Sequence, residues 1–176
     1  MIKNTTQRLV TTALMVALGL VLPMAFHAIP RGGMIFLPMH IPVLLTGFLC
    51  GPFFGLLGGL VTPLLSSLCT GMPPAAILPA MLVELAAYGL FAGLFFSLFN
   101  HKSIYARSLL SLVLAMLIGR VIAGVANAMI FQAGKFSLDL WIAGAFVTAL
   151  PGILIQLVLI PVVVVAIGKS GLSKNQ

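Results

Sequence analysis

The 176-residue chain has very few charged side chains, and acidic ones are the scarcest. Only 6% of its residues are Asp, Glu, Lys or Arg, with Glu84 and Asp139 as the two carboxylates, whereas 61% are hydrophobic. An average soluble domain carries about a quarter of its residues as charged side chains. A chain with so little charge could not cover its surface in water. The composition therefore excludes a soluble globular domain and predicts an integral membrane protein.

Sequence motifs that would indicate an enzyme are also absent. The chain has no G-x-x-x-x-G-K-[ST] motif for nucleotide phosphates, no H-E-x-x-H and no G-x-S-x-G. Two carboxylates are too few for a carboxylate-rich metal or phosphoryl-transfer site. The two cysteines, Cys50 and Cys69, lack the spacing of metal ligands. We therefore expect no enzymatic activity, no cofactor and no metal, and we expect that the chain does not hydrolyse a nucleotide itself.

Long apolar runs predict transmembrane helices. A helix needs about 20 mostly apolar residues to cross the ~30 Å hydrocarbon layer. Helices satisfy their own backbone in lipid, and the sequence shows no strands of alternating polarity. We predict a single transmembrane domain, 1–176, that forms an all-α bundle. Its six predicted helices are 8–27, 37–51, 53–70, 76–99, 107–131 and 140–167, with prolines interrupting the second and the third.

The positions of the basic residues predict the orientation in the membrane, because cytoplasmic ends of spans carry an excess of Lys and Arg. With the N-terminus inside, Arg31 and Lys135 lie outside and Arg120 lies within a span. The other six basic residues then lie inside, namely Lys3, Arg8, Lys102, Arg107, Lys169 and Lys174. We therefore predict that both termini are cytoplasmic. The same scatter leaves no basic patch for nucleic acid.

Two ionisable side chains lie inside predicted spans, where charges are costly and usually face a partner or a cavity. At 1.5 Å per residue, Glu84 lies about 12 Å and Arg120 about 16 Å below the outer surface. These similar depths allow a contact between them, either as a structural ion pair or as part of a ligand site. Tyr88 follows Glu84 by four residues and Asn127 follows Arg120 by seven, so each pair shares a helix face. These polar neighbours favour a ligand site over a purely structural ion pair.

Three further polar positions extend the predicted site. Gln156 lies about 22 Å from the outer end of its span. His40 stands between Pro38 and Pro42, where it could contact a ligand or brace a broken helix. In the first outer loop, Arg31 and its neighbour His27 could attract an anionic solute or be solvated. For Tyr88, Asn127 and Gln156 the alternative is a structural role. The predicted substrate-binding residues are Arg31, His40, Glu84, Tyr88, Arg120, Asn127 and Gln156.

Small residues predict close helix contacts in two places. Ala13 and Ala17 are four residues apart in the first predicted helix and form a smooth strip on one face. Such strips let another helix approach closely. The partner could be a separate protein or another helix of this chain. In the third predicted helix, Gly51, Gly55, Gly58 and Gly59 predict close packing within the bundle.

The size, the six spans, the basic cytoplasmic ends and the Ala13-x-x-x-Ala17 strip occur together in one known family. More specific are Phe36-Leu-Pro-Met-His-Ile-Pro-Val-Leu and the Cys50-Gly-Pro-Phe-Phe-Gly stretch that follows it. On these features, over most of its length, the chain resembles the S component, the substrate-capture subunit, of energy-coupling factor (ECF) vitamin transporters. Its likeness is to the group that includes folate and pantothenate carriers.

This resemblance implies a multi-pass protein of the bacterial cell membrane that binds a vitamin in a pocket open to the outside. It implies docking through Ala13 and Ala17 onto a transmembrane coupling subunit driven by two ATPases, with loops 28–36 and 71–75 gating the pocket. Arg31, Arg120 and His40 suit an anionic solute such as pantothenate or folate. The alternative function is a self-sufficient small carrier or channel that uses Glu84 and Arg120 as a gate or proton relay.

Overall fold

The computed structural model describes residues 2, 4–26, 28–100, 103–132, 134 and 136–169, and over these ranges all regular structure is helical. Six helical segments are long and apolar enough to cross a membrane, as predicted. They are α1, α2 with α3, α4, α5, α6 with η1, and α8. The elements are α1 (Thr5–Ala25), α2 (Gly32–Phe36), α3 (His40–Cys50), α4 (Pro52–Thr70), α5 (Leu78–Leu98), α6 (Ile104–Ala126), the π-helical η1 (Asn127–Phe131), α7 (Leu138–Ile142), the π-helical η2 (Ala143–Thr148) and α8 (Leu150–Lys169).

Two predicted helices are interrupted. The predicted helix 37–51 begins only at His40, because Leu37 adopts a left-handed conformation with φ 50° and Pro38 follows it. The prediction of one helix over 140–167 is wrong, since the chain forms α7, η2 and then α8. Pro151 lies in the first turn of α8, where its missing N–H removes no helical hydrogen bond. Trp141 consequently lies on α7 and not at the start of a spanning helix.

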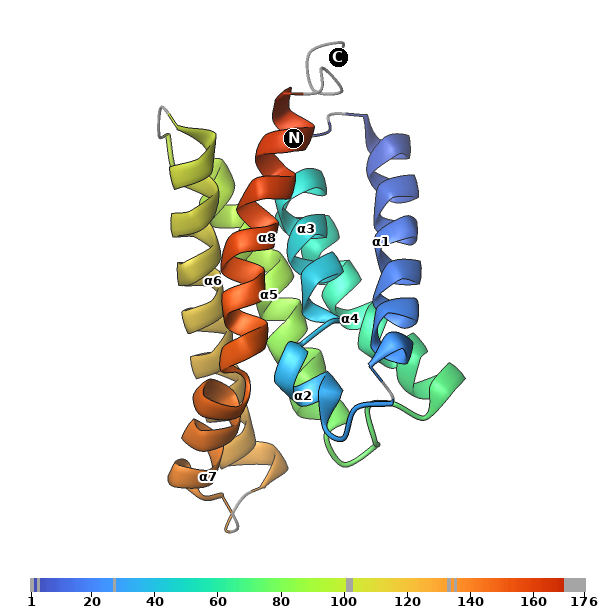
Figure 1. The fold of residues 1–176 in the computed structure, drawn as a ribbon, viewed down its shortest axis with the longest axis vertical. Coiled ribbons are helices and arrows are strands. Elements are labelled where there is room, and N and C mark those ends of the chain that lie inside the picture. The colour runs from blue at the N-terminus through green and yellow to red at the C-terminus, as the bar shows by residue number, and fades with distance from the viewer. Residues whose placement is uncertain are drawn as a thin grey trace.

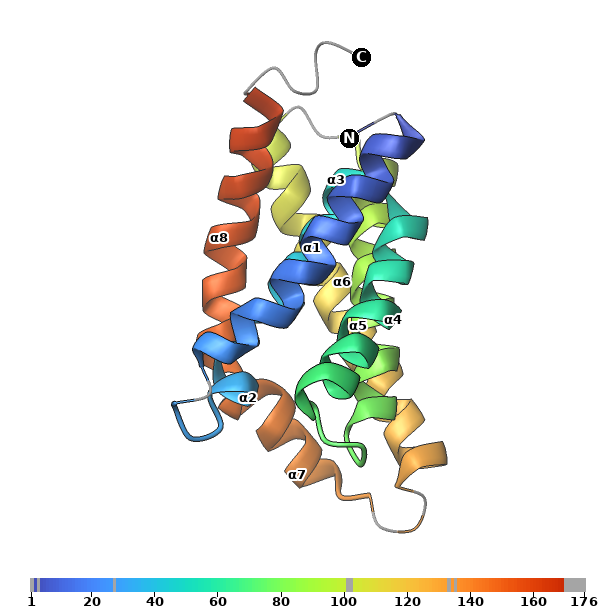
Figure 2. The same cartoon turned by 90° about the vertical axis from the view of Figure 1, so that its right-hand side faces the viewer.

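Four of the five described Lys and Arg residues lie toward the two ends of the bundle. In both views α1 begins and α8 ends at one end, where α6 also begins, while α2 and α7 lie at the other, which we call the α2–α7 end (Figures 1 and 2). Arg8, Arg107 and Lys169 therefore lie toward the first end, and Arg31, just before α2, lies at the α2–α7 end. Which end is cytoplasmic stays a prediction. His27, Lys3, Lys102, Lys135 and Lys174 lie outside the described residues.

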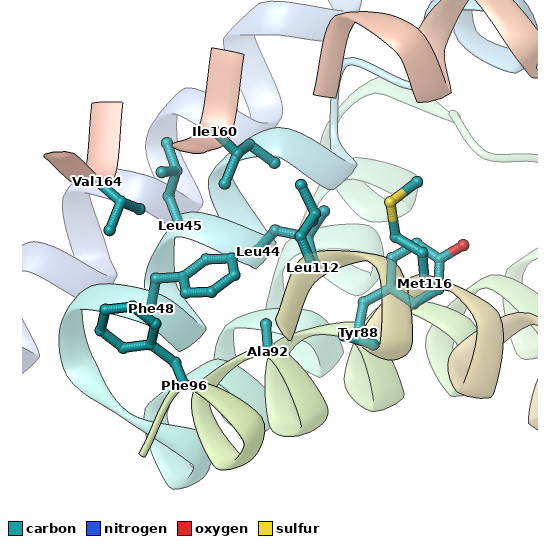
Figure 3. Packing of buried hydrophobic residues seen from close by; sticks show 11 residues of the cluster. Leu44, Leu45, Phe48, Tyr88, Ala92, Phe96, Leu112, Met116, Ile160 and Val164 are labelled. Carbon is teal, nitrogen blue, oxygen red and sulfur yellow. The ribbon is translucent and has the colours of Figure 1, made fainter. Parts of the chain in front are cut away.

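The hydrophobic core is centred on α3. This helix contacts α1, α4, α5 and α8, and it joins α5, α6 and α8 in the main buried cluster (Figure 3). Tyr88 stands at one edge of this cluster, with its hydroxyl group pointing away from Phe48 and Phe96 (Figure 3). The buried members are Leu44, Leu45, Phe48, Tyr88, Ala92, Phe96, Leu112, Ala115, Met116, Ile160 and Val164.

Glycines let α3, α4 and α5 approach closely at their backbones. A Cβ atom at Gly55 would overlap the carbonyl oxygen of Gly89, and one at Gly59 would overlap that of Leu85. This confirms the close packing predicted for these two glycines of α4. Gly51 has another role, because its φ of 96° makes the tight turn between α3 and α4. Helices α3 and α5 of this tightly packed group carry three of the polar side chains described next.

Candidate ligand-binding site

Four polar side chains from three spanning helices meet near the α2–α7 end. One carboxylate oxygen of Glu84 on α5, Oε1, lies 4.0 Å from Nε2 of His40 on α3 and 4.0 Å from Nε of Arg120 on α6. The rings of His40 and Tyr88 meet edge-on with centroids 5.5 Å apart. We call His40, Glu84, Tyr88 and Arg120 the polar cluster. The Glu84–Arg120 contact that the sequence allowed is therefore present.

The polar cluster is buried unevenly. The side chains of His40 and Arg120 are 4% exposed, whereas that of Glu84 is 24% exposed. Tyr88 is fully buried. Removing charges from water is costly unless their geometry and hydrogen bonding are good. At 4.0 Å, both contacts of Glu84 are longer than a hydrogen bond. The cluster is thus a loosely paired set of charges with one accessible member.

Several buried atoms of the polar cluster have no hydrogen-bond partner among the residues that the structure describes. These are both ring nitrogens of His40, the hydroxyl of Tyr88 and Nη2 of Arg120. Nearly all buried polar groups in native proteins are hydrogen-bonded, so each exception calls for an explanation. Here the exceptions converge on one place and include both donors and acceptors. The arrangement can therefore hydrogen-bond a polar ligand or water molecules.

The break before α3 places His40 in the polar cluster. Leu37, in its left-handed conformation, ends α2, and α3 starts at His40 with a backbone N–H that donates to the Leu37 carbonyl. Gln156 on α8 also reaches this carbonyl, with Nε2 at 3.4 Å. Its other amide atom, Oε1, is buried without a partner. Gln156 therefore braces the break and leaves one acceptor free.

An aromatic ring covers the guanidinium group of Arg120. Phe146 on η2 lies with its ring centroid 5.3 Å from Cζ of Arg120, and Trp141 packs against Phe146 at 5.9 Å. A cation over an aromatic face is stabilised by the ring, and π-helical turns such as η2 occur often at functional sites. Phe146 was not predicted as a site residue, because no motif or spacing in the sequence links it to a residue on another helix.

The remaining predicted site residues lie apart from the polar cluster. Arg31 is exposed in the loop before α2, and Asn127 is half-buried at the start of η1. Within the described ranges, neither side chain forms a hydrogen bond or ion pair with the cluster, so their ligand contact stays a prediction. A shallow apolar groove follows the outer face of α8, and it contains none of the predicted residues. It is lined by Leu154, Ile155, Val158, Leu159 and Val162.

The predicted docking strip lies on the outside of the bundle. Ala13 and Ala17 are both exposed on α1, whereas Thr12 and Gly19 are buried. The buried face of α1 packs against α3 and α4. The strip is therefore not covered by another helix within the described part of the chain, and it is available to lipid or to a partner.

Six apolar helices and a polar cluster buried between them define a class of protein, the helical membrane proteins with an intramembrane polar site. Residues 7–164 match the family described as "ECF transporter, substrate-specific component". The chain therefore belongs to this family of multi-pass cell-membrane proteins, which serves transport and is not an enzyme family. Comparison with curated proteins and with solved structures finds no match. The narrower likeness to folate and pantothenate carriers stays a prediction.

Proposed function

We propose that this chain captures a vitamin or a related micronutrient from outside the cell and delivers it through an ATP-driven ECF complex. The observation that supports this most is the polar cluster, in which buried donors and acceptors lack partners inside a transmembrane bundle. The 24% exposure of the Glu84 side chain gives this cluster one accessible member. A site of this kind binds a polar solute in an otherwise apolar protein.

Pantothenate and folate are the first candidate solutes. Both carry carboxylates, and the polar cluster offers an arginine and a histidine, with Arg31 at the same end of the bundle. Gln156 and Asn127 are proposed to add hydrogen bonds to the polar groups of the solute. The segment 28–36, which includes the short helix α2, and the loop 71–75 are proposed to gate the entrance.

The proposed partners are a transmembrane coupling subunit and two ATPase subunits. The chain has no nucleotide-binding motif of its own, so the ATP that drives this uptake would be hydrolysed by other subunits. The exposed strip of Ala13 and Ala17 is the proposed docking surface, because small side chains allow close helix contact.

Binding of radiolabelled vitamins to the purified chain tests the capture of a solute. We expect one vitamin to be retained and to raise the midpoint of thermal unfolding, since a ligand that binds only the folded state stabilises it. The control uses the same chain with an excess of unlabelled vitamin. Retention of no vitamin from a complete panel would count against the proposal.

Replacement of both strip residues, Ala13→Leu with Ala17→Leu, tests docking. We expect solute binding to stay unchanged and uptake by cells that contain the coupling subunits to fall at least tenfold, because bulky side chains keep the partner helix away. The matched control is Ala166→Leu, an exposed alanine on α8. Unchanged uptake by the double variant would exclude the strip as the docking surface.

The buried Glu84–Arg120 pair also suits a second function, a small carrier that works alone with these residues as a gate or proton relay. Reconstitution of the chain alone in liposomes separates the two functions. Accumulation of a vitamin without any ATPase would favour the independent carrier, whereas binding without accumulation favours the ECF subunit.

A further inference from the structure

The polar cluster holds an arginine with a buried hydrogen-bond donor that has no partner among the described residues. A guanidinium group has five N–H donors in a planar fork that matches a carboxylate. In the described part of the chain, Nη2 of Arg120 is buried without a hydrogen-bond partner. Its nearest carboxylate oxygen, on Glu84, lies 4.0 Å from Nε. Arg120 is therefore charged, buried and available to a better acceptor.

Glu84 can leave this contact more easily than Arg120 can. The Glu84 side chain is 24% exposed, whereas that of Arg120 is 4% exposed and lies over the ring of Phe146. A group that enters from the accessible side meets Glu84 first and Arg120 behind it. A cationic ligand drawn to Glu84 would have to sit beside the fixed guanidinium, which repels it. An anionic ligand meets no such fixed obstacle once Glu84 moves aside.

The charges of the cluster limit what can happen next. With His40 uncharged, Arg120 and Glu84 balance each other. A ligand carboxylate adds one negative charge to a buried site, and an uncompensated buried charge is very costly. Uptake of one proton from solvent, by the Glu84 carboxylate or the His40 ring beside it, restores neutrality.

Among the residues that the structure describes, no other charged group lies beside Glu84. The titratable side chains around Glu84 are His40 from α3, Tyr88 from α5 itself and Arg120 from α6. The other elements packed against α5 are α4 and η1. Of their side chains only Cys69 is titratable, and it is exposed in the last turn of α4.

We infer that the ligand carries a carboxylate that replaces Glu84 as the partner of Arg120, and that the Glu84–His40 pair takes up one proton as the ligand binds. This inference rests on the proposed capture of a vitamin and adds the chemical class of its binding group. A bidentate carboxylate satisfies the unused guanidinium donors. The displaced Glu84, once the pair is protonated, can share a hydrogen bond with His40 or Tyr88.

Matched acid and neutral probes test the chemical class. Thermal stabilisation of the purified chain is measured with pantothenate against pantothenol, biotin against its methyl ester and nicotinate against nicotinamide. We expect the acid of one pair to bind at least tenfold more tightly than its neutral partner. If the neutral member binds as well as the acid, this inference is wrong and vitamin capture stands. If no member of any pair and no other vitamin binds, the proposed function itself is wrong.

Titration calorimetry of the unmodified chain in two buffers of different ionisation enthalpy counts the protons. We expect uptake of about one proton with the acid and none with the neutral member. By linkage, the apparent affinity for the acid then falls by up to about tenfold per pH unit once the Glu84–His40 pair is fully deprotonated in the empty site. Acid binding without proton uptake would overturn the inference.

Variants then locate the proton. Glu84→Gln removes the negative charge, so we expect the acid to bind without proton uptake. Asp139→Asn removes the other carboxylate of the chain, which is exposed on α7, and we expect the uptake to remain. The double variant Arg120→Gln with Glu84→Gln removes both charges of the pair, so that neither is left buried and unpaired. We expect it to lose the preference for the acid. Persistent proton uptake in Glu84→Gln, or acid preference in the double variant, would contradict this assignment.

Discussion

Two spanning segments of this protein, α1 and the α2–α3 segment, have the same mean hydropathy and opposite surroundings. In the most apolar 18-residue window of α1, 11% of the residues are buried inside the protein, against 72% in the window of the α2–α3 segment. Both segments are apolar enough to cross a membrane. An apolar side chain meets this requirement whether it faces lipid or another helix of the protein. Hydropathy therefore identifies a span but does not tell whether lipid, a partner or the protein itself surrounds it.

The difference assigns separate tasks to the two segments. The buried α3 contacts four other helices and brings His40 to the polar cluster, so the fold and the candidate site depend on it. The exposed α1 contacts only α3 and α4 extensively, and most of its surface faces outward. A helix that is held by few internal contacts can interact with another protein without disturbing the site.

The largest expected effect comes from a bulky residue in the buried segment. For Gly47→Leu we expect a loss of about 3 kcal/mol or more in the free energy of unfolding, because a Cβ there overlaps the backbone of Gly89. Thermal unfolding of the purified chain in detergent measures it. The control Gly33→Leu, in the same segment but with open space around it, should change stability by no more than about 0.5 kcal/mol. Equal effects would remove the contrast between buried and open positions.

An intermediate effect is expected where α1 does touch the bundle. A side chain at Gly19 would overlap the methyl group of Thr62 on α4, so Gly19→Leu should cost about 1–3 kcal/mol. The same unfolding measurement applies, with Ala17→Leu on the exposed face of α1 as the stability control. If Gly19→Leu were neutral, α1 would be even less attached than its burial indicates.

The smallest effect distinguishes two fully buried threonines. Thr46 on α3 donates a 2.8 Å hydrogen bond to the carbonyl of Pro42, so Thr46→Val should cost about 1 kcal/mol. The hydroxyl of Thr62 on α4 has no partner among the described residues, so Thr62→Val should be neutral or slightly stabilising. Chemical unfolding of both variants tests this. A greater loss for Thr62→Val would show that its hydroxyl group is hydrogen-bonded in solution.

Much of the fold could be predicted, because each span leaves a local signature. Apolar runs located the six spans, and Pro38 indicated the break that separates α2 from α3. The division of the predicted helix 140–167 was missed, although Pro151 marks the first turn of α8. Prolines occur inside α1, α4 and α8 as well, so a proline alone does not locate a break.

The candidate site was predicted less completely. The similar depths of Glu84 and Arg120 in the membrane correctly indicated that the two could be in contact. They did not indicate that His40 lies beside the same carboxylate. A shared helix face grouped Asn127 with Arg120, yet seven residues correspond to about 10 Å along the axis. The contact of Phe146 with Arg120 could not be predicted, because it depends on how η2 lies relative to another helix, α6.

The sequence by itself determined that this chain spans a membrane, how many spans it has and which polar groups lie within them. These properties follow from local composition. A helix in lipid forms its own backbone hydrogen bonds, and each charged residue within it adds its own free-energy cost. Only the tertiary structure decided that α3 is enclosed while α1 is open, and that one carboxylate lies between a histidine and an arginine. Those outcomes depend on how helices far apart in the chain are rotated and which of them are in contact. Side-chain shape and glycine spacing determine this arrangement only when all the helices pack together.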